Sequence, residues 1–226
     1  MDKLVKYLCI IQARVNSSRL PCKVLLDLAG KTLIERVYDS VLKSNRIDKI
    51  IVATSEDKND DILEYKLKSL SIDYFRGDLN NVLSRYYYTA IKYKAKNIIR
   101  VTADNPLTDF NLINKLIDQY ENNEVDYCGY DNNTIVGISS EVFSFASLEQ
   151  AYLNSRNSFD TEHVTPYIKE NSKSSFIKTY LELRKPELSV TIDTFDDYIK
   201  ISKFYTYCIV NNINPQIENY LKYLRL

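Results

Sequence analysis

Residues 10–23 read IIQARVNSSRLPCK, and they join a short apolar run to a loop that carries three cations. These cations are Arg14, Arg19 and Lys23. The apolar run, residues 6–12, hardly alternates with polar residues, which predicts a strand buried on both faces of a sheet. In open α/β sheets, ligands bind beyond the carboxyl ends of the strands, and cations there suit phosphate groups. The stretch therefore predicts an α/β fold with a phosphate-binding loop after its first strand.

The composition is that of an ordinary globular protein with one large domain, expected to span residues 1–226. Hydrophobic residues make up 45% and charged residues 27%, while Lys plus Arg and Asp plus Glu both count 30. A balanced charge argues against nucleic acid as the main ligand. Four widely spaced cysteines without a CxxC motif argue against a zinc site or a redox pair. No apolar run is long enough for a membrane span or a signal peptide, so we expect a cytoplasmic protein.

Apolar runs and helical stripes alternate along the first 128 residues, which predicts a mainly parallel sheet with right-handed crossovers. The expected strands are residues 49–53, 72–75, 97–101 and 125–128, and the expected helices are residues 33–42, 61–70, 80–94 and 109–122. Beyond Gly129 the pattern loosens. There we expect strands at residues 135–138, 141–143, 176–181 and 188–192, and helices at residues 144–154, 160–171 and 195–210, with Thr194 capping the last helix.

Two isolated aspartates follow later strands of this pattern. Asp104 comes after residues 97–101 on a loop stiffened by Pro106, and Asp193 ends residues 188–192. Transfer at the α-phosphorus of a nucleotide needs cations for the leaving pyrophosphate, and carboxylates for a Mg²⁺ ion that bridges the phosphates. The residues present match this chemistry, although their types and spacing alone fit ordinary surface charges equally well. Residues 29–32, AGKT, resemble the end of a P-loop motif. The motif requires an earlier glycine, and Leu25 stands at that position, so this is not a P-loop.

Seven stretches spread over nearly the whole chain carry a family resemblance. They read IIQARVNSSRLPCKVLLDLAGKTLIERV, IIVATS, FRGDLNNVLSRYY, IIRVTADNPLTD, EVFSFASLEQA, TEHVTPYI and VTIDTFDDY. In these stretches the sequence resembles bacterial cytidylyltransferases related to CMP-sialic acid synthetases, in particular the branch of spore-coat polysaccharide biosynthesis. This resemblance implies a nucleotidyltransferase α/β fold, a twisted, mixed, mostly parallel sheet flanked by helices. It also implies transfer of CMP from CTP to a sugar or sugar-like acceptor, with release of pyrophosphate, for surface polysaccharide or glycoconjugate synthesis.

The resemblance also implies roles for individual residues. Asp104 and Asp193 match the magnesium-binding acids of the family, and Glu141 and His163 fall on the acceptor side. For these last two, a strand start and a helix-packing histidine are the alternatives. A homodimer through the less regular segment after Gly129 is expected. The implied nucleotide-binding residues are Ala13, Arg14, Ser17, Arg19, Lys23, Arg76 and Gly77, of which Arg14 and Lys23 act with Asp104 in catalysis.

Three positions depart from the pattern of this family. Cys22 stands where glycine is usual, which predicts a less flexible loop. Ala103 and Asn105 replace residues that are common in the branch, so the resemblance does not determine the acceptor pocket. The carboxylates of Asp60 and Asp61 are interpreted as helix N-terminal charges. Arg100 fits two roles equally well, a structural ion pair or a contact with the substrate.

Three other functions compete with cytidylyl transfer. The first is nucleotidyl transfer from another nucleoside triphosphate, because the amino-acid sequence does not show which backbone groups contact and select the base. The second is a glycosyltransferase of related fold, but its usual Asp-x-Asp motif is replaced by residues 102–104, Thr-Ala-Asp. The third is an inactive nucleotide-sensing module, against which the presence of every expected charged residue argues.

Overall fold

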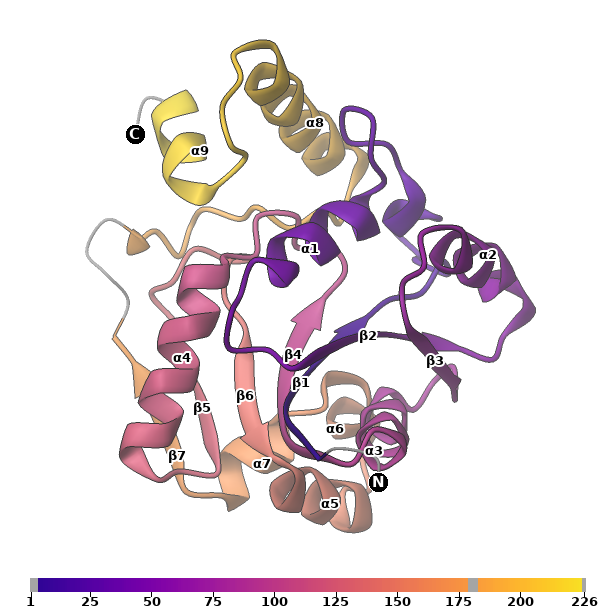
Figure 1. Cartoon of the computed structure of the whole chain (residues 1–226), viewed down its shortest axis with the longest axis vertical. Helices are drawn as coiled ribbons and strands as arrows, with labels where there is room; N and C mark the ends of the chain where they lie inside the picture. The colour runs from indigo at the N-terminus through magenta and orange to yellow at the C-terminus, as the bar shows by residue number, and fades with distance from the viewer. Residues whose placement is uncertain (1–3, 179–182, 225–226) are drawn as a thin grey trace.

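Seven strands form one mixed sheet in this computed structural model, which describes residues 4–178 and 183–224 (Figure 1). Their order is β3-β2-β1-β4-β6-β5-β7. Neighbouring strands are parallel except where β6 pairs with β4 and with β5, so the predicted mixed, mostly parallel sheet is confirmed. The strands are β1 (Val5–Gln12), β2 (Lys49–Ser55), β3 (Tyr74–Gly77), β4 (Ala95–Thr102), β5 (Tyr127–Tyr130), β6 (Glu141–Ser144) and β7 (Ser174–Ile177).

Helices cover both faces of the sheet. The face with α1, α2, α4, α8 and α9 and the face with α3, α5 and α7 each bury an apolar cluster. None of the helices in the described ranges has the length and apolar character needed to cross a bilayer. The helices are α1 (Leu33–Leu42), α2 (Asp61–Ser69), α3 (Val82–Lys92), α4 (Phe110–Asn123), α5 (Phe145–Asn154), α6 (Ser158–His163), α7 (Pro166–Asn171), α8 (Phe195–Val210) and α9 (Ile217–Tyr223), with short 3₁₀ turns at Lys23–Leu25 and Lys58–Asp60.

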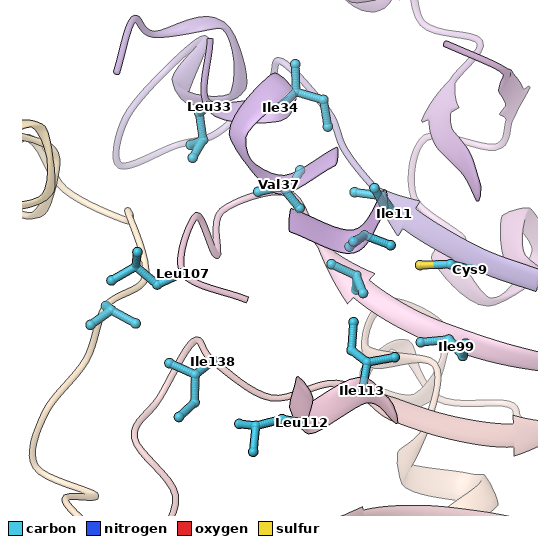
Figure 2. Packing of buried hydrophobic residues seen from close by; sticks show 14 of the residues in the cluster. Cys9, Ile11, Leu33, Ile34, Val37, Ile99, Leu107, Leu112, Ile113 and Ile138 are labelled. Atoms are coloured by element: carbon cyan, nitrogen blue, oxygen red, sulfur yellow. The ribbon is translucent and has the colours of Figure 1, made fainter. Parts of the chain in front are cut away.

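The central strand β1 is buried on both faces, as its apolar run predicts. Cys9 and Ile11 belong to one apolar cluster, and Leu8 and Ile10 belong to the other. Figure 2 shows the first cluster, in which Ile11 lies among side chains from α1 and α4. Because β1 has β2 and β4 as parallel neighbours, the loops that follow β1 and β4 meet at the same edge of the sheet.

Several predicted boundaries were wrong for local reasons. Residues 135–138 and 188–192 are not strands of the sheet but meet each other through a single bridge between Val136 and Ser189. Gly137, with φ +97°, turns the chain and prevents a regular strand there. The helix expected over residues 160–171 is two helices, because Pro166 can occupy only a first turn and begins α7.

Three further strands are displaced along the chain. The strand expected over residues 125–128 is β5, Tyr127–Tyr130. The strand expected over residues 72–75 is Tyr74–Gly77, so Arg76 and Gly77 lie within β3 rather than after it. The strand expected over residues 176–181 begins earlier, as β7 (Ser174–Ile177), and its positions 179–181 lie outside the described residues. The capped last helix is confirmed, with a capping box between Thr194 and Asp197.

Candidate active site

The cationic loop after β1 is tied to β2 by one buried carboxylate. Asp60 is 1% exposed and accepts a hydrogen bond from the amide of Val15 at 2.6 Å. It also accepts from the amide of Ser55 at 3.2 Å and from the hydroxyl of Ser55. The interpretation of Asp60 as only a helix-end charge was therefore wrong, because the side chain turns inward and fixes the loop.

The end of this loop contains a left-handed residue. Cys22 has φ 58° and ψ 17°, a conformation that costs a residue with a Cβ about 1 kcal/mol or more and costs glycine nothing. Its amide donates to the carbonyl of Val15 at 3.0 Å, which closes the loop. This conformation gives a physical reason for glycine at position 22 in the family pattern. The turn also directs the next residue, Lys23, toward the edge of the sheet.

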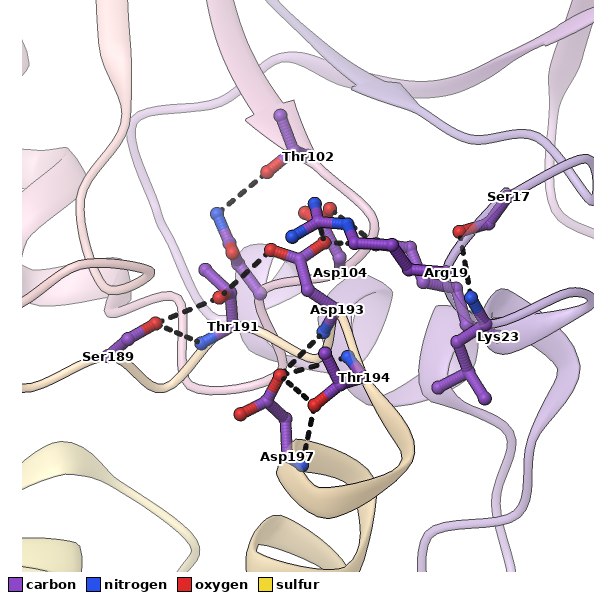
Figure 3. Close-up of polar contacts among 12 residues, drawn as sticks. Ser17, Arg19, Lys23, Thr102, Asp104, Ser189, Thr191, Asp193, Thr194 and Asp197 are labelled. Carbon is purple, nitrogen blue, oxygen red and sulfur yellow. Dashed lines mark hydrogen bonds and ion pairs between the residues drawn. The ribbon is translucent and has the colours of Figure 1, made fainter.

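Lys23 lies between the two predicted metal-binding aspartates (Figure 3). Its Nζ is 2.9 Å from Oδ2 of Asp104 and 2.9 Å from Oδ1 of Asp193. Arg19 contributes a second cation, with Nη2 at 2.9 Å from the same oxygen of Asp193. The Lys23 side chain is only 11% exposed, so its ammonium group is largely shielded from solvent, whereas the Arg19 side chain is exposed. Two carboxylates from distant parts of the sequence therefore converge on one cation.

The two aspartates are held together by backbone and capping contacts. The amide of Ile192 donates to the carbonyl of Asp104 at 2.9 Å, which ties the segment before α8 to the loop after β4. The amide and hydroxyl of Thr194 donate to Asp197 at 2.9 and 2.7 Å. Burial tends to raise the pKa of Asp197, but these hydrogen bonds lower it overall. Asp197 thus serves the helix end, which leaves Asp193 free for the cleft.

A cleft of about 470 Å³ opens beside this ion cluster. Arg14 lies on its wall and reaches Glu162 at 3.8 Å. His163, at the end of α6, packs against Phe159 with ring centroids 4.5 Å apart and the rings tilted by 57°. Most residues that the sequence singled out line this one cleft. They are Ala13, Arg14, Ser17, Arg19, Lys23, Asp104, His163 and Asp193.

Arg76 and Gly77 do not line the cleft. The Arg76 guanidinium points into α2, where it pairs with Glu64 and, at 2.7 Å, with Asp61. It also donates to the carbonyl of Ser55 at 2.7 Å. Gly77 instead packs against a cleft residue, since a Cβ at this position would lie 3.0 Å from Cγ of Arg85.

Glu141 lies in an adjoining hollow of about 350 Å³ that shares several wall residues with the cleft. It pairs with Arg100 at 2.7 Å and with Lys169 at 2.6 Å, and accepts from the hydroxyl of Tyr127 at 2.7 Å. Burial would raise the pKa of Glu141, but Arg100 and Lys169 bring it down to about 2. The ion-pair alternative for Arg100 is therefore confirmed, and Glu141 is a saturated part of the wall.

Two residues of the site were missed by the sequence analysis, Asp60 and Arg85. Arg85 lies on α3 between Val82 and Tyr86, so its helical spacing places it on the buried stripe, and this signal could have found it. For Asp60 the sequence offers no such signal, because a carboxylate at a helix start is usually solvated.

The fold and this cleft define the class of protein. A model of the cytidylyltransferase family matches residues 8–224, and the chain belongs to this family. It is 39% identical to the uncharacterized protein MJ1063 of Methanocaldococcus jannaschii, over 95% of this chain and 94% of that protein. It is 34% identical to the spore coat polysaccharide biosynthesis protein SpsF of Bacillus subtilis, over 88% and 85%.

Solved structures agree with this assignment. A cytidylyltransferase from Leptospira borgpetersenii superposes with a TM-score of 0.83 at 28% identity, covering 89% of this chain and 87% of that one. The CTP complex of a CMP:2-keto-3-deoxy-manno-octonic acid synthetase shares the fold, with a TM-score of 0.67 at 15% identity over 89% and 99% of the two chains. The predicted family, fold and cytidylyl-transferring function are thereby confirmed.

Proposed function

We propose that this chain transfers CMP from CTP to a sugar-like acceptor, with release of pyrophosphate, and that Asp104 and Asp193 hold the Mg²⁺ ion of the reaction. The observation that carries the proposal is the convergence of both carboxylates on the Nζ of Lys23, each at 2.9 Å. A pair of carboxylates that surrounds one cation beside a cationic loop suits a nucleoside triphosphate with its metal.

The residues present fit a magnesium ion. Both carboxylates offer hard oxygen ligands at the cleft, and Mg²⁺ is commonly bound by one or two carboxylates together with phosphate oxygens and water. The described residues bring no cluster of three or more His, Cys, Asp or Glu side chains together, so substrate oxygens and water would complete the coordination. Bound there, Mg²⁺ would neutralise charge on the phosphates as the pyrophosphate leaves.

The cationic loop would bind and orient the triphosphate. Lys23 and Arg19 reach the carboxylates now and can turn to phosphate oxygens, while the backbone of Ala13 and the side chain of Arg14 border the nucleotide. An acceptor oxygen would then attack the α-phosphorus in line with the leaving pyrophosphate. This kind of reaction depends mainly on positioning and on charge stabilisation by the enzyme.

The hollow that contains Glu141 would receive the acceptor. It joins the cleft through shared wall residues and has buried polar atoms without a hydrogen-bond partner in the described structure, among them Ser140 Oγ and Asn105 Oδ1. Such atoms suit the hydroxyl groups of a sugar-like compound. In this arrangement Glu141 positions Arg100 and Lys169, and His163 lies at the cleft side of the acceptor. A hydroxyl nucleophile must lose a proton, whereas a phosphate nucleophile need not.

A pyrophosphate-release assay with Mg²⁺ tests this function. CTP, UTP, ATP and GTP are each combined with a panel of sugar acids, neutral sugars and polyol phosphates. We expect release with CTP and at least one acceptor; release with another triphosphate alone would favour the alternative nucleotide, and sugar transfer without pyrophosphate would favour a glycosyltransferase. Asp104→Asn should abolish turnover while weak CTP binding persists, and near-normal turnover would reject the metal role. Light scattering of the same preparation tests the homodimer that we propose.

A further inference from the structure

Val164 occupies a strained backbone turn between α6 and α7. Its φ is +70° and its ψ is −51°, and the amide of Thr165 donates to the carbonyl of His163 at 2.8 Å, which closes a γ-turn around Val164. A γ-turn with positive φ is rare and strained, and a side chain branched at Cβ makes it less favourable still. Among the described non-glycine residues with a positive φ, Val164 is the only one that is β-branched and the only one that is buried.

The side chain of Val164 holds this turn in place. It is fully buried and belongs to the apolar cluster on the face of the sheet with α3, α5 and α7. Burial of an apolar side chain of this size offsets backbone strain of this kind. A corner that only reverses the chain needs no side chain, and glycine adopts a positive φ without strain. The valine is therefore explained by the fixed position of the corner and not by the turn alone.

The chain after the turn is fixed to the wall of the hollow. Thr165 is 2% exposed, and its hydroxyl lies 3.1 and 3.2 Å from the two carboxylate oxygens of Glu141, to which it donates. The helix α7 begins at Pro166 and carries Lys169, which pairs with the same carboxylate at 2.6 Å. The turn therefore starts from a part of the wall that an ion pair and a buried hydrogen bond hold in place.

The chain before the turn lies in the cleft. Glu162 and His163 are the last two residues of α6, and both line the cleft. Glu162 reaches Arg14 only at 3.8 Å, and both side chains are about half exposed. Such an exposed pair contributes little to the position of either partner. The place of His163 therefore depends on the turn that follows it.

We infer that Val164 is a positioning residue for the transfer reaction, an inference that rests on the proposed function. Its turn transmits the position of the wall to Glu162 and His163 and holds these two side chains toward the ligand in the cleft. Reactions that depend on positioning lose about 100-fold in rate when a group moves by roughly 1 Å. A strained turn with a buried side chain suits this task, because close packing around the side chain resists movement of the corner.

Two replacements of Val164 test the strain by urea unfolding. Val164→Ala and Val164→Gly both remove the buried anchor, but only glycine adopts the turn without strain. We expect Val164→Gly to unfold at a urea concentration equal to or above that of Val164→Ala. The matched control is Val37, a fully buried valine inside α1, where Val37→Gly should unfold at a lower concentration than Val37→Ala. The helical order at both positions would overturn the strained turn, and the inference with it.

The imidazole of His163 reports the position of the end of α6, because the chain has no other histidine. When Mg²⁺ and CTP are added, we expect the imidazole NMR signals of the wild type to shift, since His163 lines the cleft and Arg14 turns from Glu162 toward the nucleotide. Val164→Gly should bind CTP within about threefold of the wild-type affinity but lose most of this shift. The absence of a shift in the wild type, or a full shift in Val164→Gly, would overturn the inference.

Val164→Thr separates positioning from stability. Threonine has nearly the shape of valine and keeps the corner in place, but its buried hydroxyl lowers stability. In the pyrophosphate-release assay we expect kcat within about threefold of the wild type for Val164→Thr, and a kcat about 10- to 100-fold lower with a similar KM for CTP for Val164→Gly. Activities that follow the stabilities of these variants, rather than the shapes of their side chains, would contradict the positioning role.

These measurements separate the inference from the function on which it rests. A CTP-induced shift of His163 that depends on Val164, in a protein that releases no pyrophosphate, would leave the positioning by Val164 standing and refute the transfer reaction. Pyrophosphate release with CTP that is unchanged in Val164→Gly would do the reverse.

Discussion

Replacing Lys23 by Met should create a metal site in the nucleotide-free protein. In the wild type the ammonium group occupies the position between Asp104 and Asp193, at 2.9 Å from each. A Mg²⁺ ion must therefore displace a cation before it can bind both carboxylates. The methionine side chain has similar length but no charge, so Lys23→Met leaves two carboxylates without that partner and open to a divalent ion.

The structure sets the scale of the effect. At an effective dielectric constant of about 20, each contact of 2.9 Å corresponds to roughly 6 kcal/mol of Coulomb attraction before dehydration is counted. Removing Lys23 costs about 1–3 kcal/mol net, between the values for surface and buried ion pairs, because Asp104 loses Lys23 while Asp193 keeps Arg19 at 2.9 Å. A ligand at a hundredfold excess over its dissociation constant restores about 2.7 kcal/mol. For a domain of this size that corresponds to roughly 5–10 °C in Tm.

Thermal unfolding with and without 10 mM Mg²⁺ or Mn²⁺ measures this directly, and the electron paramagnetic resonance of Mn²⁺ counts the bound ions. We expect Lys23→Met to melt lower than the wild type and to regain stability with the metal, while the Tm of the wild type changes by less than about 2 °C. Lys31→Met is the matched control, since Lys31 pairs with Asp39 at the surface and should leave the metal response unchanged. Equal metal stabilisation of wild type and Lys23→Met would refute the shared position of ammonium and metal.

Variants at three further positions test the framework of the site, each by urea unfolding. Asp60→Ala should lower the free energy of unfolding by about 3 kcal/mol, because it strands buried donors of the loop; a loss below 1 kcal/mol would contradict its anchoring role. Cys22→Gly should gain up to about 1 kcal/mol and Cys22→Val lose about 1–2, and the opposite order would reject the left-handed conformation. Glu141, with a folded pKa of about 2, contributes on the order of 3 kcal/mol above pH 5 that is lost as the pH falls toward 2. The stability advantage of the wild type over Glu141→Gln should shrink across that range, and a constant difference would refute the lowered pKa.

The sequence predicted well the elements whose signals are local. The apolar run of β1 and the capping box of α8 need only their own residues to form, and both are where they were expected. The segment after Gly129 was predicted less well, because its structure depends on pairing with distant chain. Val136 has a single bridge to Ser189, and no periodicity in either segment shows that the sheet excludes them.

The site shows the same division. Lys23 and Asp104 could be predicted as neighbours because the loops after parallel strands share one edge of the sheet. Asp193 was expected there for the wrong reason, since residues 188–192 are no strand of the sheet and the amide of Ile192 is held by the carbonyl of Asp104. Asp60 could not be predicted, since its inward rotamer depends on the amide donors of Val15 and Ser55. Arg76 shows the opposite case, in which the resemblance implied a place that its side-chain contacts do not reflect. Its place in the family pattern pointed to the nucleoside, but the acidic side chains of α2 hold it away from the cleft.

The ion pairs of the cleft affect the order in which its ligands bind. Lys23 and Arg19 are neutralised by aspartates, so a triphosphate with its metal exchanges one set of ion pairs for another and adds little new desolvation. These ion pairs should therefore set the order in which metal and nucleotide enter. We expect a metal to bind the wild-type protein only together with a triphosphate, because the phosphates must first draw Lys23 away from the aspartates.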